Sequence, residues 1–376
     1  MRRGSAVRVR HLSTAHNIGD TRIVHKECRS LQASGFDVAF IACHDGDEVV
    51  AGVPVLGIGT ARGRADRMTR KAWDMFRRAL RERADIYHFH DPELIGVGLA
   101  LRALGKKVVY DVHEDVPKQI TNKFWIPGIV RRPVALAARI VEGVAARAVS
   151  AVVTATPSIA EKFPAHKTIS CQNFPEKGMA VEKNDVPFTE RPHAFVYVGG
   201  LTRHQGIVEM VEALDKVPEG VSGVFAGAFD EPSDAIEAMP GWRRVDFVGR
   251  LDRAGVVDVL RKGRVGLVID HPITNYVDAY STKMFEYMAC GLPFIASDFP
   301  LWVRIVEDAD CGVTLDPYDT DAVAAALVRY LEDPELAARH GENGRQAILN
   351  RYNWDIEYAK LLACYEGMLC SHRRES

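Results

Sequence analysis

Two carboxylates and an ammonium group lie close together in the segment from Asp278 to Glu286. Ser281 suits the N-cap of a helix predicted over 282–290, because its hydroxyl can accept a hydrogen bond from an amide one turn into the helix. A helix start gathers unpaired N–H groups and the positive end of the macrodipole, which together bind phosphate. Lys283 opposes that dipole in the first turn, and a bound anion would offset this cost. With carboxylates to accept from sugar hydroxyls, the segment predicts a nucleotide-sugar site; the alternative is an ordinary helix with Lys283 and Glu286 in water.

A pair of glycines ends the strand predicted over 195–201. Gly199 and Gly200 lie in its last residues, and Arg203 follows before a helix predicted over 207–214. A strand that ends in two glycines and opens into a helix lets backbone amides approach phosphate. We therefore expect this turn to belong to the same anion site.

Histidines lie at or just after the ends of the strands predicted over 7–13, 85–90 and 107–112. Ligands of parallel sheets bind at the carboxyl ends of the strands, so these side chains should lie along one edge. Their types suit hydroxyl recognition in a wet sugar cleft. Zinc is the alternative, but no HxxxH pair appears and we predict no metal ligand. The predicted cleft residues are His16, His90, Asp91, His113 and Glu114.

The loop from His16 to Arg22 contains one glycine, Gly19. The glycine and the helix that follows it can approach a diphosphate, and Arg22 is a candidate contact for an acceptor phosphate or for the cleft. An N-cap turn made by Asp20 explains the same residues.

Strands and helices alternate along most of the chain, at a spacing typical of βαβ units and a parallel sheet. At 376 residues the chain is too long for one ordinary core and fits two domains. The further predicted strands are 36–42, 53–58, 152–154, 169–173, 221–227, 245–250, 265–270, 294–297 and 313–315. The further predicted helices are 21–34, 92–104, 125–148 with breaks near Pro127 and Pro133, 319–331, 335–350 and 352–368.

The run from Ser281 through Glu286, Gly291 and Pro293 to Ser297 resembles the donor-site signature of retaining glycosyltransferases of family 4, which have the GT-B fold. The resemblance extends in order over most of the chain. It implies two Rossmann-like parallel-sheet domains of the α/β class that face each other across a cleft. The implied boundaries are an acceptor-side domain at 1–175, a linker at 176–192, a nucleotide-sugar domain at 193–350, and at 351–376 a helix that crosses back to the first domain.

The resemblance also implies roles for the candidate residues. Lys283 and Arg203 would stabilise the leaving diphosphate, Asp278 would hold a donor-sugar hydroxyl, and His113 would lie near the transferred sugar. Glu286 would hold the ribose, and Arg250 and Leu251 would read the base. The remaining donor-site residues are Gly199, Gly200, Ser281 and Thr282.

The chain departs from the family pattern at three positions. Asp278 stands where the family has the first glutamate of a pair, which shortens its reach by about one methylene. Gly200 and Gln205 stand where the family usually has an arginine and a lysine. Fewer cations would then hold the diphosphate.

Composition excludes several classes of protein. With 47% hydrophobic and 26% charged residues there is no case for disorder. Seven cysteines without a CxxC pair favour a reducing cytosol. The alternation of Val and Arg over 7–11 interrupts any signal-peptide core, and no window approaches the length of a membrane span. We expect a cytoplasmic protein, with the inner face of the cell membrane as one place of action.

Positive charge is concentrated in the first half of the chain. Residues 1–180 contain 28 Lys and Arg against 18 Asp and Glu, and the rest contain 20 against 32. Much of the excess lies in 62–83, a predicted amphipathic helix that can lie on anionic lipid; a solvated surface helix is the alternative. Nucleic acid is not indicated. The apolar residues that share one face of this helix are Met68, Ala72, Met75, Phe76, Ala79 and Leu80.

The preferred function is therefore a retaining, metal-independent glycosyltransferase. It would move a sugar from a nucleoside diphosphate donor, with UDP as the nucleotide, to a glycan or lipid-linked acceptor of a cell-surface polysaccharide or glycolipid. The donor is a co-substrate, and no cofactor is expected. The alternatives are a GT-B nucleotide-sugar epimerase and a glycosyltransferase-like binding subunit that has lost turnover.

Overall fold

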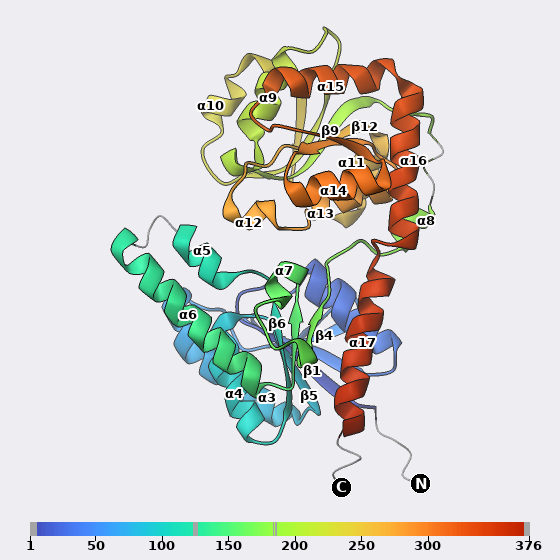
Figure 1. Cartoon of the computed structure of the whole chain (residues 1–376). Helices are drawn as coiled ribbons and strands as arrows, with labels where there is room; N and C mark the ends of the chain where they lie inside the picture. The colour runs from blue at the N-terminus through green and yellow to red at the C-terminus, as the bar shows by residue number, and fades with distance from the viewer. Residues whose placement is uncertain (1–5, 123–126, 183, 185, 372–376) are drawn as a thin grey trace. The chain divides into compact units, whose positions relative to one another are not determined.

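The computed structural model describes residues 6–122, 127–182, 184 and 186–371. The chain divides into two compact units. Unit 1 contains the described residues up to Asn173 together with those from Ile356 onward, and unit 2 contains those from Phe174 to Asp355. Each unit is built on its own sheet with helices on both faces (Figure 1). The prediction of an α/β fold with two Rossmann-like, mainly parallel sheets is confirmed.

The sheet of unit 1 has the order β3-β4-β2-β1-β5-β6-β7-β8. All neighbours pair in parallel except β3, which is an antiparallel edge strand beside β4. Most residues of the inner strands are buried, as expected for a sheet covered on both faces. The strands are β1 (Arg8–Ser13), β2 (Asp37–Ala42), β3 (Glu48–Val50), β4 (Val53–Gly57), β5 (Ile86–Phe89), β6 (Lys107–Val112), β7 (Ala151–Thr154) and β8 (Thr168–Ser170).

Helices cover both faces of this sheet (Figure 1). The last helix of the chain, α17 (Trp354–Ser371), packs on unit 1, where the Tyr365 Oη lies 2.7 Å from Nδ1 of His88. The other helices of unit 1 are η1 (Thr21–Cys28), α1 (Arg29–Ala33), α2 (Arg64–Asp66), η2 (Arg67–Lys71), α3 (Ala72–Glu82), η3 (Pro92–Leu94), α4 (Ile95–Ala103), α5 (Val116–Asn122), α6 (Gly128–Ala148), α7 (Pro157–Ala160) and η4 (Ala165–Lys167).

The sheet of unit 2 has the order β11-β10-β9-β12-β13-β14, with every pair parallel. The order reverses between β9 and β12, and the carboxyl ends of the strands at such a switch point form the usual ligand crevice of open α/β sheets. The strands are β9 (His193–Leu201), β10 (Gly223–Phe229), β11 (Val245–Gly249), β12 (Gly263–Val268), β13 (Phe294–Ser297) and β14 (Gly312–Leu315).

Two apolar clusters fill the two faces of this sheet. One joins α13 to α14 and α16 through Met288, Trp302 and Ile348, and the other joins α9 to α15 through Met210 and Leu327. The helices of unit 2 are α8 (Gly178–Val181), η5 (Phe188–Glu190), η6 (Arg203–Gln205), α9 (Ile207–Asp215), α10 (Asp234–Glu237), η7 (Pro240–Arg244), α11 (Arg253–Lys262), α12 (Thr274–Val277), α13 (Thr282–Ala289), α14 (Pro300–Ala309), α15 (Thr320–Glu332) and α16 (Pro334–Asn350).

The predicted helix 125–148 and the predicted linker 176–192 are among the segments that differ from the sequence expectation. Pro133 lies inside α6 without breaking it, so the predicted break there is wrong; the start of that predicted helix, 125–126, lies outside the described residues. The described part of the predicted linker 176–192 contains two short helices and buries Ala180 and Phe188 among residues of unit 2.

Candidate functional site

Tyr287 fixes α13 on the two central strands of unit 2. The register of β9 with β12 runs as far as Val196 opposite Gly266. Beyond that point the Val198 N–H donates to the Tyr287 Oη at 3.3 Å, and the Tyr287 hydroxyl donates to the Leu267 carbonyl at 3.2 Å. The buried backbone groups are thereby satisfied where the ladder ends. The helix that carries Lys283 and Glu286 is thus held at the switch point.

The ends of α13 follow the predicted pattern with one difference. At the carboxyl end, Gly291 has a φ of 63°, the Leu292 N–H donates to the Tyr287 carbonyl, and the Gly291 N–H donates to the Met288 carbonyl. This is a Schellman motif, which needs the left-handed conformation that glycine adopts without strain. At the other end Ser281 is the N-cap residue as predicted. Its side chain makes no capping hydrogen bond within the described chain, so the predicted hydroxyl cap is wrong.

Lys283 lies beside the glycine turn that ends β9. Its Nζ is 2.8 Å from the Asp270 Oδ1 and 5.1 Å from the centre of the Tyr197 ring. A Cβ on Gly199 would be 3.3 Å from the Lys283 Cδ and 3.0 Å from the Tyr197 Oη, so the lysine stem needs a residue without a side chain there. The ion pair is largely buried, with side-chain exposures of 11% for Lys283 and 5% for Asp270. The ammonium group is therefore held in place at the carboxyl end of the sheet.

Glu286, one turn further along α13, forms an ion pair with Arg253. Its side chain is 14% exposed, whereas that of Arg253 is 48% exposed and also contacts the Met179 sulfur at 3.3 Å. The sequence reading missed Arg253 because it predicted no helix at α11. The residue that could have indicated this helix is Asp252. It caps α11 by accepting from the Gly255 N–H at 2.8 Å.

A cavity of about 340 Å³ opens at the carboxyl ends of β9 and β10. It brings together four predicted donor-site residues, Gly199, Gly200, Arg250 and Leu251. Its other lining residues are small or apolar, so backbone groups are accessible on its walls. A flat ring and a phosphate chain suit such walls. The residues that complete the lining are Val198, Ala226, Gly227, Ala228 and Val256.

Other predicted donor residues are not part of this cavity lining. Arg203 forms an exposed ion pair with Glu231, with 3.6 Å between Nε and Oε2. Gln205 lies over Gly200, since its Oε1 would be 2.6 Å from a Cβ placed there. Asp278, which ends α12, and Thr282 are both exposed. Their predicted roles stay predictions.

A second cavity, of about 410 Å³, lies in unit 1 at the carboxyl ends of the strands. It brings together the predicted cleft residues His16, His90, Asp91, His113 and Glu114. Arg64 and Arg67 also line it; they belong to the basic segment 62–83, for which lipid contact and a solvated surface helix are the two expectations. The cavity therefore offers cationic, imidazole and carboxylate groups to a polar ligand.

Asp91 organises the rim of this cavity. It accepts from the Ser13 hydroxyl at 2.8 Å and from the Thr14 N–H at 2.5 Å, and its Oδ1 lies 3.0 Å from the His16 Nδ1. Burial opposes both charges, but their mutual attraction and hydrogen bond outweigh it. The pKa of His16 is raised and the pKa of Asp91 falls below its usual range. His16 is thus a cation at the rim under mildly acidic conditions.

Asp111 joins the cavity to the interior. Its Oδ2 lies 3.2 Å from the His90 Nδ1 and 3.2 Å from the His113 Nε2, and both of its oxygens lie 3.2 Å from the Arg22 Nη2. Burial lowers the pKa of His90 to about 4, so its imidazole is neutral at physiological pH. His90, Asp111 and His113 all line the cavity, and His113, with a side chain 17% exposed, is the most exposed of them.

Gly19 and Arg22 are not among the residues that line this cavity, and their place in the cleft stays a prediction. Arg22 is 5% exposed and points inward to Asp111. The Gly19 N–H donates to the Asn17 Oδ1 at 2.8 Å, so it already has a partner. Asp20 accepts from the Ile23 N–H at 2.8 Å and caps η1, which is the structural alternative noted for this loop.

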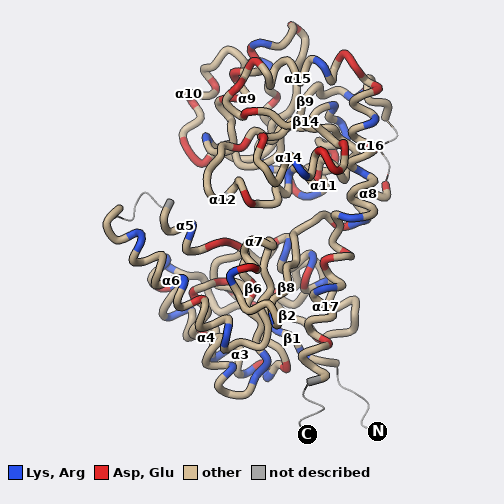
Figure 2. Tube along the Cα trace, viewed as in Figure 1, with Lys and Arg blue, Asp and Glu red and all other residues tan. Residues whose placement is uncertain are grey.

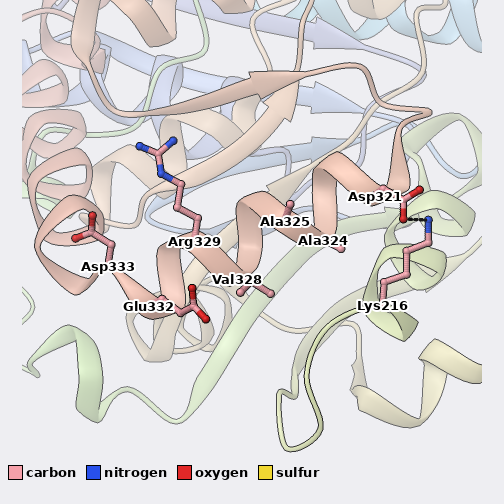
Figure 3. Close-up of a pocket in the computed structure, with 8 residues that line it drawn as sticks. All are labelled: Lys216, Asp321, Ala324, Ala325, Val328, Arg329, Glu332 and Asp333. Carbon is pink, nitrogen blue, oxygen red and sulfur yellow. Dashed lines mark ion pairs between the residues drawn. The ribbon is translucent and has the colours of Figure 1, made fainter.

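A larger cavity, of about 500 Å³, lies along α15 and contains none of the predicted site residues. Figure 3 shows its polar contact, an ion pair between Lys216 and Asp321, beside Ala324, Ala325 and Val328. No glycine turn lies among its lining residues. Size alone therefore does not mark the site.

The basic segment 62–83 forms α2, η2 and α3 (Figure 2). Its apolar face turns inward, because Met75 and Ala79 are fully buried in the core of unit 1. Met75 and Ala79 are therefore not available to lipid, whereas Met68, Trp73 and Leu80 are exposed. In the described residues, helices fall short of the length and hydropathy that a membrane crossing requires.

Comparisons with known proteins agree with this description. The family model "Glycosyl transferase 4-like domain" matches residues 19–169, and "Glycosyl transferases group 1" matches residues 179–347. Phosphatidyl-myo-inositol mannosyltransferase of Mycobacterium leprae is 27% identical over 171 residues, 44% of each chain. Glycogen synthase of Mycobacterium tuberculosis is 25% identical over 179 residues, 45% of this chain and 42% of the relative. These alignments span less than half of the relatives' length.

Solved structures share the fold over nearly the whole chain. Sucrose-phosphate synthase from Thermosynechococcus elongatus has a TM-score of 0.76 at 18% identity, covering 97% of this chain and 100% of that chain. Anabaena Alr3699/HepE in complex with UDP-glucose has a TM-score of 0.72 at 16% identity, covering 96% and 99%. The two Rossmann-like units therefore have the GT-B type of fold. The chain belongs to the group 1 glycosyl transferases, also described as family 4.

Proposed function

We propose that this chain transfers a sugar from a nucleoside diphosphate donor to a glycan or lipid-linked acceptor, with retention of configuration at the anomeric carbon. The observation that carries the proposal is the position of Lys283, held by Asp270 against the glycine turn at the carboxyl end of β9. Family membership supports the reaction class, and the relatives' names include two sugar-polymer or glycolipid enzymes.

The donor site would lie in unit 2. Departure of the diphosphate builds negative charge, so a preorganised cationic and dipolar pocket lowers the barrier. Lys283 and the amides at the start of α13 would supply that pocket without a metal at the diphosphate. Arg203 would join them only after leaving Glu231. Glu286, oriented by Arg253, would accept from the ribose hydroxyls.

UDP is the proposed nucleotide. The cavity beside Gly199 and Leu251 has small walls on which a flat base can lie, and a structural neighbour is described in complex with UDP-glucose. Asp278 would hold a donor-sugar hydroxyl, and His113 is the proposed contact of the transferred sugar. The proposal includes no covalent intermediate on a carboxylate: the acceptor would attack from the face the diphosphate leaves.

The cavity of unit 1 is the proposed acceptor site. Its two arginines, Arg64 and Arg67, together with His16 suit an acceptor that carries phosphate or carboxylate. An acceptor in cell-surface polysaccharide or glycolipid synthesis fits these groups. No cofactor beyond the donor is proposed for the transfer step.

Contact with an anionic membrane is a further part of the proposal. The arginines of 62–83 supply positive charge, and α6 exposes several apolar side chains, with Ile129 at 89% and Leu136 and Ile140 each at 58% exposure. The action would be at the cytoplasmic face, where the free cysteines stay reduced. Vesicles containing phosphatidylglycerol should pellet the protein at low salt and release it at high salt. Equal pelleting with neutral vesicles would contradict an electrostatic contact.

The test of the function is acceptor-dependent release of UDP. The full chain is incubated with a panel of UDP-sugars, with and without glycan and lipid-linked acceptors, and the product is examined by proton NMR. We expect UDP release that depends on an acceptor, and an anomeric configuration equal to that of the donor. UDP with an altered free monosaccharide and no acceptor would indicate an epimerase. Donor binding without UDP release under any condition would indicate a binding subunit.

A further inference from the structure

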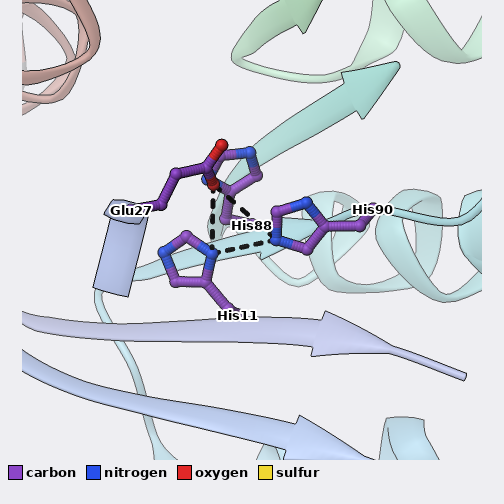
Figure 4. A group of neighbouring side chains, drawn as sticks. All are labelled: His11, Glu27, His88 and His90. Atoms are coloured by element: carbon purple, nitrogen blue, oxygen red, sulfur yellow. Dashed lines mark hydrogen bonds and ion pairs between the residues drawn. The ribbon is translucent and has the colours of Figure 1, made fainter. Parts of the chain in front are cut away.

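A group of three histidines and one glutamate lies inside unit 1, beneath the acceptor cavity. His11 comes from β1, Glu27 from η1, His88 from β5, and His90 directly follows β5 (Figure 4). Their side chains are all fully buried. His11 and His88 are partners in the parallel register of β1 with β5, and His88 and His90 share one face of their strand. The fold itself thus gathers these four side chains.

The atoms of this group have the spacing of metal ligands. The His11 Nδ1 lies 2.9 Å from the His90 Nε2 and 3.7 Å from the Glu27 Oε2, which is 4.0 Å from the His90 Nε2. Ligand atoms bound to zinc at about 2.0–2.1 Å in a tetrahedron lie about 3.4 Å apart. A ligand atom from each of the four residues falls within 4.8 Å of the others. Small side-chain movements would complete a four-coordinate site.

Several polar atoms of the group are buried without a hydrogen-bond partner among the described residues. They are the His88 Nε2, the His11 Nε2 and both carboxylate oxygens of Glu27, although Glu27 Oε1 is 3.1 Å from the Arg22 Nε. Leaving buried polar atoms unsatisfied costs stability, and native proteins rarely do so without a reason. A cation at the centre would satisfy the glutamate and one histidine nitrogen together.

Neighbouring groups set two of the histidines in the form that binds a metal. The His90 Nδ1 faces the Asp111 carboxylate at 3.2 Å, so the proton lies on Nδ1 and the lone pair of Nε2 points into the group. The His88 Nδ1 lies 2.7 Å from the Tyr365 Oη, which leaves Nε2, 3.7 Å from the Asp111 Oδ2, as the atom available to a metal. Carboxylate or hydroxyl partners that orient a ligating imidazole in this way are typical of metal sites.

We propose that His11, Glu27, His88 and His90 bind one divalent transition-metal ion with the coordination preference of zinc. Imidazole nitrogens with a carboxylate oxygen are ligands that zinc accepts. A cation between the Glu27 carboxylate and the imidazoles would offset the cost of burying that carboxylate. The ion ties η1 to the two central strands and, through His90 and Asp111, holds His113 at the cavity. It is separate from the proposed donor site in unit 2.

Sequence spacing gave no metal motif here because the ligands come from distant positions. Residues 11, 27 and 88 lie on three elements that meet only in the folded sheet. His88 and His90 are the one close pair among the four, and a single such pair is common in strands. The topology therefore shows a site that the sequence pattern does not.

The test is the metal content of the full chain. Protein is purified without chelators from medium supplemented with ZnCl2, and its metals are measured by inductively coupled plasma mass spectrometry. We expect about one zinc ion per chain, and a loss of at least about tenfold in His88→Gln and Glu27→Gln. His166→Gln, at an exposed histidine of the same unit, is the matched control and should keep its metal. Circular dichroism of each variant shows whether it is folded.

A second measurement keeps the test decisive if the variants do not fold. The wild-type chain is unfolded, stripped of metal and refolded with CoCl2, and its absorption spectrum is recorded. We expect visible bands of a four-coordinate nitrogen and oxygen site without thiolate charge-transfer bands. Metal below about one ion per ten chains in both preparations, thiolate bands, or full metal retention in folded His88→Gln would each overturn the proposal.

Discussion

The Lys283 Nζ lies 2.8 Å from the Asp270 Oδ1. This ion pair links the first turn of α13 to Asp270, two residues after the end of β12. The ammonium is thereby fixed at the end of the central strands, over Gly199. A lysine in the first turn of a helix is unfavourable for the macrodipole. Asp270 offsets part of this cost, and a bound diphosphate would offset more.

Replacing Lys283 with methionine should lower kcat strongly. The change keeps the length of the side chain and removes the charge that faces the leaving group, so we expect a loss of about 10²–10³-fold. Steady-state rates of UDP release measure it. Lys262→Met, at an exposed lysine of the same unit paired with Asp258, should leave kcat unchanged. Equal rates for Lys283→Met and wild type would remove the leaving-group role.

Replacing Arg253 with alanine should weaken donor binding more than it changes stability. Glu286 loses the partner that orients its carboxylate, and we expect the KM for the donor to rise about tenfold. Because Arg253 is about half exposed, the melting temperature should change little. Arg243→Ala, an exposed arginine paired with Asp215, is the control. An unchanged KM in the Arg253 variant would separate Glu286 from the ribose.

Replacing Tyr287 with phenylalanine should destabilise unit 2. The hydroxyl accepts from the Val198 N–H and donates to the Leu267 carbonyl, and both groups would lose that buried partner. We expect a loss of about 1–3 kcal/mol in the free energy of unfolding, measured in urea. Tyr318→Phe, at an exposed tyrosine of the same unit, should stay within about 0.5 kcal/mol of wild type. Equal stability of the two variants would mean that the Tyr287 hydroxyl does not support the strand ends.

Glu142 predicts a pH dependence of stability in unit 1. Burial raises the pKa of this carboxyl from 4.5 to about 7, beside the Tyr110 hydroxyl at 3.1 Å. The folded state then binds the proton more tightly than the unfolded state, so stability from this group is full below pH 4.5 and is lost as the pH rises to about 7. Glu142→Gln keeps the neutral form at every pH.

The variant should therefore be more stable than wild type at pH 8, by about 1–3 kcal/mol, and similar at pH 4.5. Urea unfolding at both pH values measures the difference. Glu161→Gln, at an exposed glutamate, serves as the control. A constant difference between wild type and Glu142→Gln across this range would contradict the proposed cause.

The alternation of strands and helices could be predicted from the sequence. Strands of a sheet that is covered on both faces appear as short apolar runs between polar turns. β6 was predicted at its observed bounds, and α13 ended at Gly291 as its glycine required. The helix break predicted at Pro133 is wrong. It is the sixth residue of α6, and the carbonyl it leaves without an amide partner belongs to Ile129, which is 89% exposed and open to water.

The sequence predicts candidate site residues where neighbouring positions in the chain determine the site. It does not predict the direction in which a side chain points in the folded structure. Lys283, in the first turn of α13, lies beside Gly199 near the end of β9, as a shared anion site requires. Arg22 was expected in the cleft, but its helix turns it inward to Asp111. Arg253 was missed because no helix was predicted at α11, and because its contact with Glu286 spans 33 residues, which local spacing does not show.

The most direct test of the central claim is calorimetric comparison of UDP and uridine binding to the wild-type chain and to Lys283→Ala. If the glycine turn and Lys283 bind a diphosphate, wild type should bind UDP at least about tenfold more tightly than uridine, which corresponds to about 1.4 kcal/mol. In Lys283→Ala that preference should largely disappear while uridine binding stays the same. Equal binding of UDP and uridine by wild type, or an undiminished UDP preference in Lys283→Ala, would contradict the account.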